Sequence, residues 1–148
     1  MKRDPRLRDL SRDHHRALVL ARRAAGSADG TDEAVAATWR TVRDEYAHHL
    51  APHFDVEERC LLAPLELRGE EALVRRTRQE HEQLRALLNS SDGPRARLCA
   101  FADLLRAHVR FEERELFPAA EALLSPAELQ RAATESAPTR PDRCNDEG

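Results

Sequence analysis

Two histidines in this chain are each followed four residues later by a glutamate: His53 by Glu57, and His108 by Glu112. In an α-helix this spacing places both side chains on one face, one turn apart. Imidazoles and carboxylates bind metals, and burying them without a partner costs several kcal/mol. Because both pairs lie on otherwise apolar helix faces, the spacing points to a metal site.

Each of these pairs is preceded along the chain by an acidic residue directly followed by a histidine, Asp13-His14 and Glu80-His81. His14 shares an apolar stripe with leucines, and we place it ahead of its neighbour His15, which stays an alternative because the rotation of that helix is open. The chain therefore divides into two similar halves. Packed about a pseudo-twofold axis, they would bring six ligand-type residues together: His14, His53, Glu57, His81, His108 and Glu112.

Four imidazoles and two carboxylates exceed the four ligands of a structural zinc ion. They fit two metal ions bridged by the two glutamates, each ion with two imidazoles and room for a small exogenous ligand. Mixed imidazole and carboxylate donors suit iron, with manganese or zinc as less favoured ions. The alternative without metal is a helical interaction module with a buried polar network.

The elements that would position these residues are helices. Alanine, leucine, arginine and glutamate dominate the chain, and aromatic residues make up only 4%. Apolar stripes at helical spacing predict helices over about residues 4–25, 31 to 64 or 69, 73–88 and 98–123, with a short last helix from Ser125. Pro52 is expected to kink the second helix or to start a new segment. The prediction is an all-α, antiparallel up-down four-helix bundle over 1–132 and a disordered tail over 133–148.

Charge and hydropathy narrow the function further. The 24 basic and 27 acidic residues give a net charge of −3, which argues against a nucleic-acid partner. No apolar run approaches the ~20 residues of a membrane span. The three cysteines (Cys60, Cys99 and Cys144) form no CxxC pair, and the charged N-terminus is unlike a signal peptide, so a cytoplasmic location is expected.

The segments around these residues resemble the hemerythrin-like, or HHE cation-binding, family. The resemblance rests on SRDHH at residues 11–15, HFDVEE at 53–58, EH at 80–81 and HVRFEERELFP at 108–118, and covers roughly residues 7–124. It implies a four-helix bundle with a non-haem di-iron site whose ligands would be the six residues named above. Thr77 and Arg85 flank His81 where the oxygen-carrying members have a second histidine, and the last helix has HxxxE instead of HxxxxD.

The leading hypothesis is a protein that binds two iron ions and binds or senses oxygen, nitric oxide or peroxide, or stores iron. The alternative is an enzyme that degrades peroxide at the same centre, as a catalase or peroxidase does. The chain shows neither a nucleophile triad nor a phosphate loop, so we favour a binding protein over an enzyme. The expected partner is a diatomic gas or a peroxide, and the oligomeric state is open.

Overall fold

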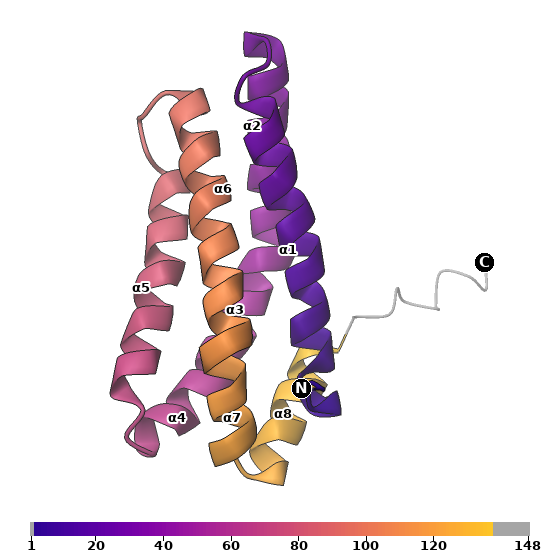
Figure 1. The fold of residues 1–148 in the computed structure, drawn as a ribbon, viewed down its shortest axis with the longest axis vertical. Helices are drawn as coiled ribbons and strands as arrows, with labels where there is room; N and C mark the ends of the chain where they lie inside the picture. The colour runs from indigo at the N-terminus through magenta and orange to yellow at the C-terminus, as the bar shows by residue number, and fades with distance from the viewer. Residues whose placement is uncertain (1, 138–148) are drawn as a thin grey trace, which may run out of the picture.

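The structure is a computed structural model that describes residues 2–137. These residues form five continuous helical segments and no strand, which confirms the predicted all-α class (Figure 1). In chain order the segments are α1 (Arg8–Ser27); α2, α3 and α4 (Asp32–Glu45, Ala51–Glu57 and Ala63–Leu67); α5 (Glu71–Leu88); α6 and α7 (Pro94–Phe111 and Phe117–Leu123); and α8 (Pro126–Ser136). A 3-10 turn, Pro5–Leu7, precedes α1.

Local signals in the sequence explain where the helices begin and end. The Thr31 hydroxyl accepts a hydrogen bond from the Ala34 amide at 3.1 Å and so caps α2. Ser125 and Glu128 form the expected capping box at the start of α8. After α4 the chain turns at Gly69, whose φ of +87° is readily adopted by glycine alone.

Prolines inside the two long segments do not break them, because each proline follows a wider, π-helical turn. These turns are Tyr46–Leu50, Glu58–Leu62 and Glu112–Leu116, and the prolines are Pro52, Pro64 and Pro118. The residue before each proline donates its amide to the carbonyl five residues back. The extra residue makes room for a ring that would otherwise clash with the preceding turn. The second segment therefore continues past Pro52 and Pro64 to Leu67.

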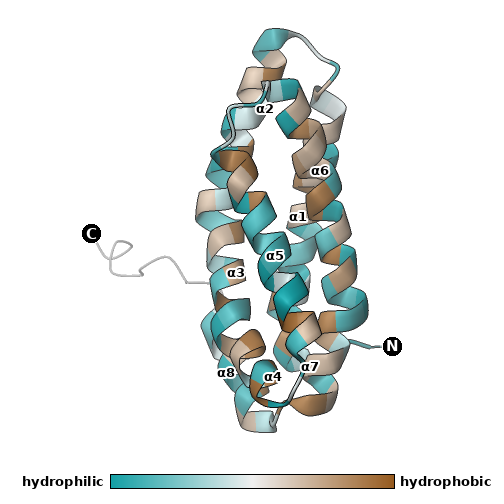
Figure 2. Ribbon diagram, turned by 90° about the vertical axis from the view of Figure 1, so that its left-hand side faces the viewer, coloured by the Kyte–Doolittle hydropathy of each residue, from teal (hydrophilic) through white to brown (hydrophobic). Residues whose placement is uncertain are grey.

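The long helices lie side by side, with α1 against α2 and α6, and α5 against α6 (Figure 1). Hydrophobic and hydrophilic residues are interspersed along them (Figure 2), as amphipathic helices require. Two apolar clusters fill the interior. The upper cluster surrounds Trp39 and Phe101, and the lower cluster surrounds Leu61 and Phe117. Along α1, Leu10 belongs to the lower cluster and Ala17 to the upper, with His14 between them.

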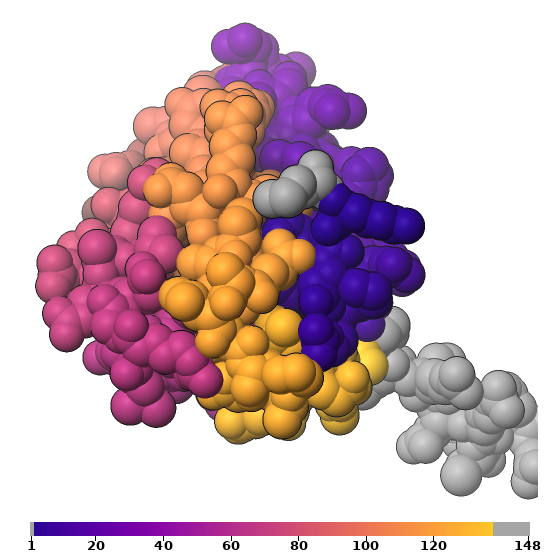
Figure 3. Space-filling view, turned by 60° about the horizontal axis from the view of Figure 1, so that its bottom comes forward, coloured from indigo at the N-terminus to yellow at the C-terminus, as the bar shows by residue number. Residues whose placement is uncertain are grey.

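The last helix closes the lower end of the molecule. Figure 3 shows α8 (yellow) beside the N-terminal segment (indigo) and α7 (orange). Leu129 and Ala132 bury this helix against the lower cluster. It continues to Ser136, past the expected end at 132, and the Ser136 hydroxyl donates to the Ala132 carbonyl at 2.7 Å. The rest of the expected tail, 138–148 with Cys144, lies outside the described residues.

Hydropathy along the helices is too low for a membrane span: over the described part of the chain, none is both long and apolar enough to cross a bilayer.

Candidate metal centre

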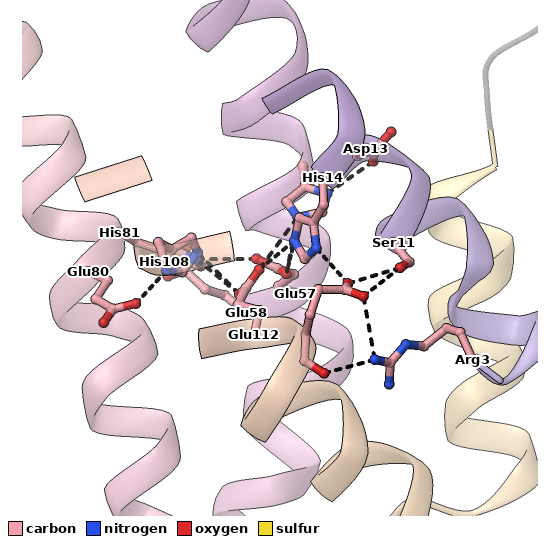
Figure 4. Close-up of polar contacts among 12 residues, drawn as sticks. Arg3, Ser11, Asp13, His14, Glu57, Glu58, Glu80, His81, His108 and Glu112 are labelled. Atoms are coloured by element: carbon pink, nitrogen blue, oxygen red, sulfur yellow. Dashed lines mark hydrogen bonds and ion pairs between the residues drawn. The ribbon is translucent and has the colours of Figure 1, made fainter. Parts of the chain in front are cut away.

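The six residues singled out by their spacing converge between the two apolar clusters (Figure 4). They come from α1, from α3, from α5, and from α6 with the π-helical turn after it. All six are buried, with at most 4% of any residue exposed: His14, His53, Glu57, His81, His108 and Glu112. On α1 the inward residue is His14, whereas His15 is exposed. The alternative left open for that helix is thus resolved in favour of His14 as the residue that joins the cluster.

The cluster consists of two overlapping groups, and within each the four ligand-type atoms lie no more than 4.8 Å apart. One group is His14, His53, Glu57 and Glu112; the other is His81, His108, Glu57 and Glu112. The two glutamates belong to both groups. This is the arrangement expected of two cation sites that share a pair of bridging carboxylates.

Each glutamate directs one oxygen to each histidine pair. Glu57 Oε2 lies 3.1 Å from His53 Nε2, while its Oε1 lies 3.2 Å from His81 Nε2. Glu112 Oε1 lies 2.8 Å from His14 Nε2, while its Oε2 lies 3.2 Å from His108 Nε2. All four imidazoles therefore present Nε2 to the interior, and both carboxylates span the two groups.

Most of these inward atoms have no hydrogen-bond partner among the described residues. The set comprises Nε2 of His53, His81 and His108, both oxygens of Glu57, and Oε2 of Glu112. Buried polar atoms are normally satisfied, since leaving one unpaired costs about 1–3 kcal/mol. A concentration of orphaned atoms at one point, all of them metal-ligand types, fits a pair of cations bound between them.

The outward nitrogen of each histidine contacts a carboxylate. The four Nδ1 contacts are His14 with Glu113 at 2.7 Å, His53 with Asp13 at 3.0 Å, His81 with Glu58 at 3.3 Å, and His108 with Glu80 at 2.7 Å. A carboxylate accepts, so each Nδ1 carries the proton and donates it. The Nε2 lone pair then points inward, and the ring is held in orientation for a metal.

The outer carboxylates follow the pseudo-twofold relation of the two halves. Asp13 precedes His14 in sequence but accepts a hydrogen bond from His53. Likewise, Glu80 precedes His81 but accepts a hydrogen bond from His108. In the same way, Glu58 and Glu113 each follow a central glutamate and contact a histidine from the other half of the chain. The two acid-histidine pairs are visible in the sequence, but the histidine that each acidic residue contacts is not. The available signal was an acidic residue beside each of four candidate ligands.

The charges of the cluster stabilise one another in the metal-free protein. Burial alone would lower the pKa of His81, but the carboxylates of Glu112, Glu57 and Glu58 close to its ring outweigh burial and raise the pKa to about 11. Burial is likewise outweighed at His108, where the negative charge of Glu112 raises the pKa to about 9. The same contacts hold the pKa of Glu112 well below its ordinary value, although burial opposes this. Cations would replace protons on these imidazoles.

Aromatic rings shield the cluster from water above and below. Phe54 stacks on the His81 ring with centroids 4.0 Å apart, and Phe117 stacks on His14 at 5.1 Å. Both phenylalanines are almost fully buried. These buried rings give the cluster an apolar boundary, which strengthens electrostatic interactions within it.

Comparison with known proteins agrees with this geometry. The family model described as the hemerythrin HHE cation-binding domain matches residues 6–120. Neither the curated proteins nor the solved structures that were searched gave a match. The matched range contains all six buried ligand-type residues and the four carboxylates behind them. The chain belongs to the hemerythrin HHE cation-binding domain family.

Proposed function

We propose that this protein binds two iron ions and uses them to bind or sense oxygen, nitric oxide or peroxide, or to store iron. The observation that carries the proposal is the pair of four-residue groups that share Glu57 and Glu112. Their inward atoms lack other partners, so metal binding would satisfy groups whose burial is otherwise unfavourable. We interpret the four long helical segments as the antiparallel bundle that holds these ligands, and we keep the cytoplasm as the proposed location.

The donor set favours iron and leaves space for a further ligand. Each half of the centre offers two imidazole nitrogens and two carboxylate oxygens, fewer than the six positions common for iron. A bound iron pair would supply redox chemistry and open positions for a diatomic molecule or a peroxide. The residues of this chain would hold the ions, fix the imidazole tautomers through Nδ1, and exclude water with Phe54 and Phe117.

Elemental analysis together with optical absorption tests this proposal. Protein produced in iron-replete cells should contain about two irons per chain, as the two groups require, and should show ferric charge-transfer bands. Replacing Glu57 or Glu112 by alanine should remove both ions, because each carboxylate serves both groups. His15→Ala is the matched control and should keep full metal content, since His15 is exposed. Protein that takes up no metal would overturn the proposal.

A second measurement separates binding from turnover. The iron-loaded protein should form a stable spectral adduct with nitric oxide or azide, a small anion that mimics peroxide, and should not consume hydrogen peroxide steadily. Sustained peroxide loss that disappears in His108→Ala would contradict a binding role and identify a peroxide-degrading enzyme instead.

A further inference from the structure

The two ends of the centre are related by sequence but differ in their surroundings. At one end His53 contacts Asp13, and at the other His108 contacts Glu80. The Asp13 side chain is 51% exposed, whereas the Glu80 side chain is only 18% exposed. Of these two equivalent carboxylates, Asp13 is thus exposed to solvent and Glu80 is largely buried.

A basic side chain covers the Glu80 end. Arg76 Nε donates to Glu80 at 3.1 Å, and the Arg76 guanidinium lies 4.0 Å from the centre of the Phe111 ring. Among residues 2–137, no arginine or lysine forms an ion pair with Asp13; the nearby Arg16 pairs with Glu45 at 2.8 Å and interacts with Asp13 only at longer range. A cation approaching Asp13 therefore meets a carboxylate that no basic side chain contacts directly.

An open cavity of about 270 Å³ lies at the Asp13 end, and its lining includes His53, whose side chain is only 1% exposed. Its polar lining includes Asp13, His48, His49, His53 and Glu135. A divalent cation that keeps ~six waters needs roughly 180 Å³, at about 30 Å³ per water. The cavity is large enough for a hydrated cation, and its carboxylates and imidazoles are groups that bind one.

The backbone also differs between the two ends. His53 directly follows Pro52, which has no amide hydrogen, and the π-helical turn Tyr46–Leu50 precedes both. His108 instead lies within α6, an uninterrupted α-helix from Pro94 to Phe111. A helix that lacks a regular hydrogen bond opens locally more readily than a continuous one. Displacement of His53 should therefore need less energy than displacement of His108.

We propose that divalent metal ions enter and leave the centre through the cavity at Asp13 and His53, and not at Glu80 and His108. A hydrated cation first meets Asp13 and then reaches the inner carboxylates as the His53 ring moves aside. This inference rests on the proposed function, because it concerns the route to the same centre.

The rate of cobalt(II) uptake tests the route. Metal-free full-length protein is mixed with Co²⁺, and the visible absorption of the bound ion gives both a rate and a final stoichiometry. Asp13→Asn and Glu80→Gln each weaken one contact to a ligand imidazole, so they are matched variants. Asp13→Asn should slow uptake about tenfold, because focused negative charge raises association rates by about that factor or more. Glu80→Gln weakens the equivalent contact to His108 but leaves the cavity at Asp13 unchanged, so it should slow uptake much less than Asp13→Asn does.

A second pair of variants tests the cavity without altering a contact of any ligand. His49→Trp narrows the cavity and should slow both uptake of Co²⁺ and its removal by a chelator. His15→Trp is the control, an exposed histidine outside the cavity lining, and should leave both rates unchanged. Equal rates for the matched variants, or an unaffected His49→Trp, would overturn the route while the final stoichiometry stayed at two. Absence of Co²⁺ uptake by the unmodified protein would overturn the proposed function itself.

Discussion

The upper apolar cluster and the ligand cluster beneath it occupy neighbouring layers of the same helices, yet they differ in how many buried polar atoms they hold. Around Trp39 and Phe101, the buried side chains of the cluster are hydrophobic, and one of their polar atoms, Trp39 Nε1, lacks a hydrogen-bond partner among the described residues. Around Glu57 and Glu112, buried atoms lack partners. We therefore expect folding and metal binding to be separable: the apolar layers should assemble the helices, and the ligand layer should add stability when it binds cations.

The largest expected effect comes from the apolar layer. Phe101 is fully buried, and its ring meets Trp39 edge-on at 6.5 Å. Phe101→Ala should lower the free energy of unfolding by about 3–5 kcal/mol through lost burial and the cavity left behind. Urea denaturation should show the same loss with and without metal. A loss that depended strongly on metal would break the proposed separation of the two layers.

Metal removal should produce the next largest loss of stability. This loss should depend on the ligand-type residues of the cluster. At a free metal concentration of 100 times the dissociation constant, one bound ion stabilises the native state by about 2.7 kcal/mol. A chelator should therefore lower the melting temperature of the unmodified protein. Glu57→Ala should melt at the same temperature with or without chelator, and a remaining chelator effect in that variant would place the ions elsewhere.

The pH dependence of stability should distinguish metal-free from metal-loaded protein. The pKa of His108 is raised to about 9 and that of His81 to about 11, mainly because their contacts with Glu112 outweigh burial. A raised pKa stabilises the native state below the unfolded value of about 6.5, and this stability is lost as pH rises through the folded value.

The metal-free protein should consequently melt at a lower temperature at pH 9.5 than at pH 7, by about 5 °C. The metal-loaded protein should change little over this range, because its imidazoles hold cations instead of protons. Thermal scans at both pH values measure this. A metal-free protein that became more stable toward pH 9.5 would contradict the charge network described for the cluster.

The smallest effect is expected at the lower end of the molecule, outside both layers. Ser125→Ala removes the hydroxyl that accepts from the Glu128 amide at 3.2 Å and should destabilise the protein by about 1 kcal/mol. Metal content should remain unchanged because α8 supplies no ligand-type residue to the centre. Loss of metal in this variant would show that the packing of α8 affects metal binding at the centre.

Helical spacing predicted all six residues that converge, since a period of 3.6 residues determines which side chains share a face. It favoured His14 but kept His15 as an alternative, because adjacent residues differ by about 100° and the choice depends on how α1 rotates against its neighbours. Helical spacing also could not predict which carboxylate contacts each imidazole. Asp13 and His53 are 40 residues apart, and His14 and Glu113 are 99 apart, so both contacts depend on the packing of separate helices.

Helix propensity also could not predict the wider turns that precede the internal prolines. A proline within a helical pattern predicts a kink or an end, and Pro52 was expected to cause one or the other. The structure places a wider turn ahead of Pro52, Pro64 and Pro118, and a further α-helical stretch begins at the residue before each proline. Whether an extra residue can be accommodated depends on the neighbouring helices, so propensity alone could not reveal it.

Those wider turns make the length of the chain at these points as important as its composition. A deletion of one codon within Tyr46–Leu50 would remove the extra residue and favour a regular helix. His53 and Glu57 would keep their orientation relative to α2, because the wide turn uses one residue more than a regular turn for about the same rotation. The ring of Pro52 would lose the room that the wide turn provides and would clash with the preceding turn, at a cost of about 3 kcal/mol. In genetic terms, a short in-frame deletion here should reduce stability while leaving all six ligand-type side chains in their places.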